Sequence, residues 1–146
     1  MLGPRLRTGI RVGLLAAAAT AGVLIGLGLR HDAALTPFLL YGRSLVASFS
    51  SAIPPSGVAL VVGALAHGFW MLVWGACFTL VAGPLRGRPL AVASGLYGVL
   101  CVFGVMRFFP VMLGALPLAS LTVPQSLLLV VVLALVLFLG TRIARE

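Results

Sequence analysis

The sequence predicts an all-α integral membrane protein, a single domain of residues 1–146 in which four transmembrane helices form one bundle. Apolar residues make up 62% of the 146-residue chain and charged residues 8%, whereas a soluble domain carries about a quarter charged residues. The chain also holds four long stretches without a charge: Val12–Leu29, Ser44–Leu85, Pro89–Met106 and Phe108–Thr141. Since roughly 20 apolar residues form a helix that crosses a bilayer, each stretch is long enough for one span.

All four expected spans are helices, and the first of them is not expected to be removed as a signal peptide. They lie at about residues 9–30, 58–81, 89–109 and 125–141. Helices are expected because a backbone inside hydrocarbon must satisfy its own hydrogen bonds, and these uniformly apolar segments lack the alternation of barrel strands. The first span follows a basic leader, but its apolar run Val12–Leu29 is longer than that of a signal peptide. We therefore expect it to remain in the protein.

The arginines predict the orientation of the bundle. With four spans, the two terminal tails and the middle loop lie on one side. These regions hold most of the ten basic residues: Arg5, Arg7, Arg11, Arg86, Arg88, Arg142 and Arg145. Because cytoplasmic loops are enriched in Lys and Arg, both termini should be cytoplasmic, in what we expect to be a bacterial inner membrane. The net charge of +8 fits contact with the lipid bilayer, and no basic patch interleaved with aromatics indicates nucleic-acid binding.

An outer interfacial helix is expected between the first and second spans. Thr36 followed by Pro37 is typical of an N-cap and a first helical position. One helical face then carries larger apolar side chains: Phe38, Tyr41, Leu45 and Phe49. This pattern suits a helix that lies at the membrane surface and ends before Pro54. An irregular loop and a re-entrant hairpin are the alternatives.

Small residues predict packing faces. The first span has two rows of them at a spacing of four: Ala18, Gly22 and Gly26, and Gly9, Gly13, Ala17 and Ala21. Such rows let helix backbones approach closely, which is how membrane helices associate. The first span is therefore the expected central or oligomer-forming helix. The fourth span has no such row and is expected to face lipid.

His67 is the most distinctive polar residue within a span. It shares a helical face with Trp70 and Trp74 and lies about 15 Å from the outer end of its span. At this depth an ionisable residue is a functional candidate. It could ligate haem or a metal, relay protons or line a ligand pocket, but we favour a neutral imidazole bonded to a neighbouring helix. The only other histidine, His31, is about 15 Å away along the membrane normal, which disfavours haem held by two histidines of one chain.

A second candidate site is a cluster of charged and polar residues expected at the outer ends of the spans. It consists of Arg30, His31, Asp32, Arg43 and Arg107. Arg107 interrupts an apolar run, and we favour a side chain that extends to the headgroups. An outer anion site and an ion pair between Arg107 and Asp32 are the alternatives.

The sequence offers little catalytic chemistry. Asp32 and Glu146 are the only carboxylates, so paired-carboxylate catalysis is excluded within one chain. Neither a nucleotide-binding motif nor a Cys-x-x-Cys motif occurs, and we predict no catalytic residue, metal or cofactor. The leading hypothesis is a non-enzymatic accessory or assembly component that packs against other membrane proteins or copies of itself. The alternatives are a small transporter or channel for an apolar or anionic solute, using His67 and Arg107, and a haem-bearing membrane anchor subunit.

Overall fold

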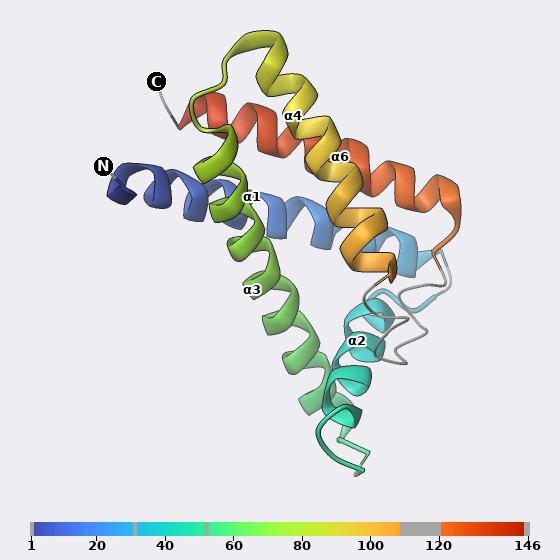
Figure 1. Ribbon diagram of the computed structural model, residues 1–146. Helices are drawn as coiled ribbons and strands as arrows, with labels where there is room; N and C mark the ends of the chain where they lie inside the picture. Colours follow the sequence, from blue (N-terminus) through green and yellow to red (C-terminus); the bar gives the residue numbers. More distant parts are fainter. Residues whose placement is uncertain (1, 31, 52, 109–120, 145–146) are drawn as a thin grey trace.

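The computed structural model is helical throughout the residues that it describes, which are 2–30, 32–51, 53–108 and 121–144. No strand occurs in these ranges. In chain order the helices are α1 (Leu2–Leu29), α2 (Thr36–Ala47), α3 (Ser56–Ala82), α4 (Gly87–Val99), the π-helix η1 (Leu100–Phe108) and α6 (Val123–Ile143) (Figure 1).

In the described part of the chain, four helical segments are long and apolar enough to cross a membrane. They are Gly3–Leu29, Ser56–Ala82, Gly87–Gly104 and Val123–Ile143, the third of which continues from α4 into η1. The prediction of four membrane helices is therefore confirmed by length and composition. The structure extends the second and fourth expected spans by one or two residues at each end, and it lengthens the first toward the N-terminus. The protein is a membrane-embedded helical bundle.

The helices alternate in direction. α1 and α6 run side by side in opposite directions, α4 packs against α6, and α3 packs obliquely on α1 (Figure 1). The start of α1, the turn between α3 and α4, and the end of α6 consequently gather at one end of the bundle (Figure 1). We call this the arginine-rich end, because it carries Arg5, Arg7, Arg11, Arg86, Arg88 and Arg142.

Glycine brings α1 and α3 into backbone contact near the arginine-rich end. A Cβ atom on Gly13 would lie 2.7 Å from the Cα atom of Leu72, and one on Gly75 would lie 2.5 Å from the Gly13 nitrogen. No side chain fits into these gaps. The expectation that Gly9 and Gly13 form a packing row is therefore confirmed.

α2 packs on the N-terminal half of α3 through a second pair of glycines (Figure 1). A Cβ atom on Gly42 would collide with the carbonyl oxygen of Ala59, and one on Gly63 would collide with that of Phe38. A helix occupies the predicted segment, but it ends at Ala47, so one of the four residues of the predicted face lies outside it. Phe38 is buried, whereas Phe49 lies beyond the last helical residue and is 86% exposed. The close crossing selects glycine for the buried face, and an amphipathic pattern of large residues does not reveal this.

α6 lies against both α1 and α4, so the expectation that it simply faces lipid is wrong. Leu129, Leu133 and Leu137 are each at most 1% exposed, while Leu135 and Leu139 on the same helix are exposed. A capping box begins the helix, in which the Thr122 backbone N–H donates to Oε1 of Gln125 at 2.8 Å. Large aliphatic residues fill a helix interface as well as they cover a lipid-facing surface, and composition does not separate the two.

Candidate functional site

His67 is buried between α3 and α1. Its side chain is 7% exposed, and its Nε2 atom lies 3.1 Å from the Thr20 hydroxyl oxygen and 3.4 Å from the Ala17 carbonyl oxygen. The Phe38 ring of α2 meets the imidazole edge-on, with ring centroids 5.5 Å apart. The imidazole therefore contacts all three of the helices α1, α2 and α3.

The hydrogen bonds of Thr20 determine which imidazole nitrogen carries the proton. The Thr20 hydroxyl donates to the Ala16 carbonyl at 2.7 Å, and a hydroxyl has a single hydrogen to donate. Its oxygen must therefore accept from His67, which places the proton of a neutral ring on Nε2. The other nitrogen, Nδ1, is then an acceptor, and it has no hydrogen-bond partner in the described part of the chain.

The same imidazole lines a pocket of about 420 Å³ between α1, α2 and α3. The other lining residues are all uncharged and apolar: Ala17, Ala21, Ile25, Leu35, Phe38, Leu60, Ala64 and Gly68. The pocket forms because α2 packs mainly on α3 and contacts α1 little. Its volume falls within the range of small-molecule sites.

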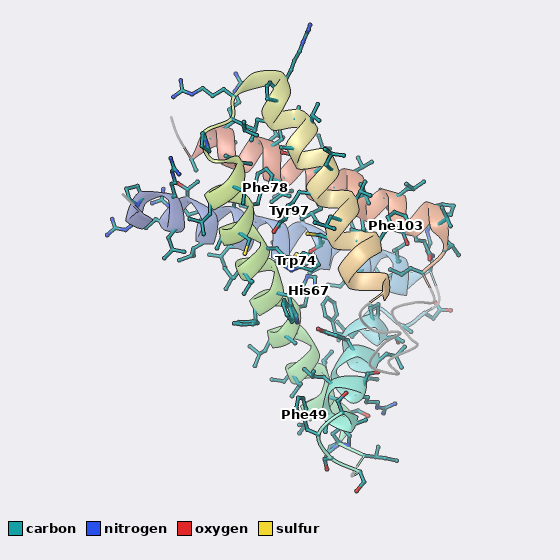
Figure 2. The ribbon with its side chains drawn as sticks, viewed as in Figure 1. Phe49, His67, Trp74, Phe78, Tyr97 and Phe103 are labelled. Atoms are coloured by element: carbon teal, nitrogen blue, oxygen red, sulfur yellow. The ribbon has the colours of Figure 1, made fainter. Side chains whose placement is uncertain are left out.

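Trp70 and Trp74 share the predicted face with His67 but serve other contacts. Figure 2 shows His67, Trp74 and Phe78 in this order along α3. Trp74 is buried, and its carbonyl oxygen accepts a hydrogen bond from the Tyr97 hydroxyl of α4 at 3.1 Å. The Trp70 side chain forms a hydrogen bond with the Tyr41 side chain of α2. Burial raises the pKa of the Tyr41 phenol, and this hydrogen bond partly offsets the rise. Of the three, only His67 lines the pocket.

The described members of the outer cluster lie at two places. Arg30 and Asp32 are exposed in the turn after α1, where Asp32 adopts a left-handed conformation with φ of 53°. Arg43 joins α2 to the start of α3, because its Nη2 atom donates to the Ser56 hydroxyl oxygen at 3.0 Å. His31 and the side chain of Arg107 lie outside the described residues. The anion site and the Arg107–Asp32 ion pair therefore stay predictions.

Thr20 and Phe38 belong to the site but were not identified as members from the sequence. Thr20 had a signal, since it is the only polar residue in the apolar run Val12–Leu29. Metal-binding clusters of three or more His, Cys, Asp or Glu residues are absent from the described ranges. Cys77 and Cys101 are both free, the first exposed and the second buried.

Comparison with known proteins adds no information on function. No protein-family model, curated protein or solved structure matches the chain. The functional proposal therefore depends on the structure alone.

Proposed function

We propose that the protein is a non-enzymatic accessory or assembly component that packs laterally against a transmembrane helix of a partner membrane protein. The observation that carries this proposal is the unused row of small residues on α1. Ala18, Gly22 and Gly26 are all exposed. A Cβ atom on Gly22 or Gly26 would meet nothing within 4 Å among the described residues.

The two small-residue rows of α1 differ in their surroundings. The row with Gly9 and Gly13 is filled by α3, whereas the row with Gly22 is open. On α3 the exposed positions Val61, Leu65 and Phe69 carry large side chains, whereas α4 also carries exposed small residues, such as Gly87 and Ala91. An open backbone surface gains little from lipid tails but permits close packing with another helix. The open row on α1 therefore favours a helix as its occupant.

The proposed orientation has both termini in the cytoplasm of a bacterial cell. It is supported by the gathering of the described tail and middle-loop arginines at one end of the bundle (Figure 1). α2 then belongs to the outer half of the protein, where an interfacial position would place it beside the first half of α3.

The test is affinity purification in a mild detergent, with quantitative mass spectrometry of the wild type and two variants. Gly22→Leu should abolish recovery of a stoichiometric partner. Gly57→Leu on α3 is the matched control. A Cβ atom on Gly57 also meets nothing within 4 Å of the described chain, but the next residues at a spacing of four are the large Val61 and Leu65. Equal recovery with both variants, or no partner with the wild type, overturns the proposal. If only further copies of this chain are recovered through the row, the protein forms a homo-oligomer and the partner-protein proposal is wrong.

Transport is the second candidate function, and the pocket favours an apolar solute over an anionic one. None of its lining residues is charged, so an anion would lose its hydration without compensation. Solute flux in liposomes that is lost on His67→Ala or Arg107→Ala would favour transport over the accessory role. The absorption spectrum of the purified protein tests the haem-bearing alternative, which requires a Soret band.

A further inference from the structure

We propose that the pocket beside His67 binds an uncharged membrane lipid with a single hydroxyl group, whose hydrocarbon packs on the apolar walls and whose hydroxyl donates to Nδ1 of His67. This inference goes beyond the accessory role and does not rest on it. It concerns the space between α1, α2 and α3, whereas the proposed partner surface is the open row on α1.

Contacts with α1 and α2 fix the orientation of the imidazole, so that Nδ1 is its hydrogen-bond acceptor. Thr20 and Ala17 engage Nε2 on the α1 side, and the ring of Phe38 packs against the imidazole from α2. Since the Thr20 hydroxyl has already given its hydrogen to Ala16, the ring cannot exchange donor and acceptor nitrogens without losing a hydrogen bond. Nδ1 is therefore available as an acceptor, and none of the other residues that line the pocket has a polar side chain.

The walls determine the rest of the ligand. Alanine, leucine, isoleucine and phenylalanine side chains line the pocket beside the imidazole, which favours hydrocarbon as the bulk of the ligand. An ionised headgroup would be buried without a counter-charge, so the ligand is uncharged. One unsatisfied acceptor calls for one donor, and a hydroxyl is the simplest group that supplies it.

The position of the pocket points to the bilayer as the source of the ligand. His67 is 11 residues along α3 from Ser56, which corresponds to about 16 Å of helix. Ala64 and Leu35 line the pocket and are themselves exposed on the surface of the bundle. Within a membrane this surface contacts lipid tails. A hydroxyl at such a depth would find no water, and Nδ1 would provide its hydrogen bond.

The experiment uses the full-length protein in lipid nanodiscs with two photoreactive probes. One is a long-chain primary alcohol that carries a diazirine, and the other is its methyl ether, which has the same chain but no hydrogen to donate. The extent of labelling is measured as a function of probe concentration, and the labelled peptide is identified by mass spectrometry. The alcohol should half-saturate the α1–α3 site at a concentration about three- to tenfold lower than the ether, as expected for one hydrogen bond.

Three variants give this comparison its controls. Ala64→Leu fills the pocket and should remove labelling by both probes, while Ala91→Leu makes the same change on the exposed surface of α4 and should leave labelling intact. His67→Phe should retain ether labelling but lose the preference for the alcohol. The melting temperature of the His67→Phe variant shows whether this variant folds. If it does not fold, the wild-type preference and the two alanine variants still decide the outcome.

Three results would overturn the inference. The first is equal half-saturation by alcohol and ether in the wild type, which would leave Nδ1 without a role. The second is labelling that Ala64→Leu does not reduce, and the third is no labelling of the site at all. Gly22→Leu should not change labelling, so failure of the partner proposal and failure of this one are distinguished.

Discussion

Thr20 lies on α1 and His67 on the neighbouring helix α3, and the Thr20 hydroxyl oxygen accepts a hydrogen bond from Nε2 of His67 at 3.1 Å. On one side of this pair, toward the arginine-rich end, Gly13 and Gly75 bring the backbones of α1 and α3 into contact. On the other side the two helices line the open pocket together with α2. The Thr20–His67 bond thus marks the point at which a tight helix interface gives way to an open pocket.

The protonated nitrogen of His67 can be measured directly. The chain has two histidines, so selective ¹⁵N labelling of histidine gives a spectrum of two side chains. We expect His67 to be neutral with the proton on Nε2. Thr20→Val should weaken this preference, because only the Ala17 carbonyl oxygen, 3.4 Å from Nε2, then remains as an acceptor, and Thr20→Ser should keep it. A proton on Nδ1, or a charged ring at neutral pH, would contradict the hydrogen-bond assignment.

The glycine contacts between α2 and α3 predict a large effect of one methyl group. Gly42→Ala or Gly63→Ala places a Cβ atom against a carbonyl oxygen, and we expect a loss of stability of about 1–3 kcal/mol, as is typical of overpacking. Thermal unfolding in detergent checks the prediction. The control is Gly57→Ala on the same helix, where a Cβ atom meets nothing within 4 Å in the described structure. Equal melting temperatures for Gly63→Ala and Gly57→Ala would rule out the close crossing.

The hydrogen bond from Tyr97 to the Trp74 carbonyl joins two helices that otherwise share few contacts. Tyr97→Phe should therefore lower the free energy of unfolding by about 0.5–1.5 kcal/mol. Ser94→Ala on the same helix is the comparison, because the Ser94 hydroxyl bonds to the Leu90 carbonyl within α4. We expect Ser94→Ala to have the smaller effect. The opposite order would show that the Tyr97 bond does not hold the two helices together.

Orientation can be tested with single cysteines in a chain whose two native cysteines are replaced by serine. Ser51→Cys lies in the exposed connection between α2 and α3, and Gly3→Cys lies at the start of α1. A membrane-impermeant maleimide should label Ser51→Cys in intact spheroplasts and Gly3→Cys only after lysis. The reverse pattern would place both termini outside the cell.

Local signals in the sequence account for much of the fold. The lengths of the apolar runs predict the four membrane helices, and Thr36 with Pro37 predicts the start of α2, which lies one position earlier than expected because Thr36 is its first residue. These features depend only on neighbouring residues in the chain. The side of a helix that is buried depends instead on which helices become neighbours.

The candidate site shows the same limit. His67 could be identified from the sequence, because an ionisable residue in an apolar run stands out. Its partner Thr20 is 47 positions away, and nothing in the local pattern links the two. The rows of small residues on α1 were equally visible, but only the structure shows that α3 occupies one and leaves the other open.

The shape of the bundle has a consequence for the surrounding membrane. α1 and α3 touch closely near Gly13 and Gly75, while α2 is added beside the opposite half of α3 (Figure 1). If α2 lies within one leaflet, as its proposed interfacial position requires, that leaflet gives up more area than the leaflet around the arginine-rich end. Such a wedge fits with least strain where the membrane bows outward on the α2 side. The local curvature of the bilayer, and not only its thickness, would then influence where in the cell the protein accumulates.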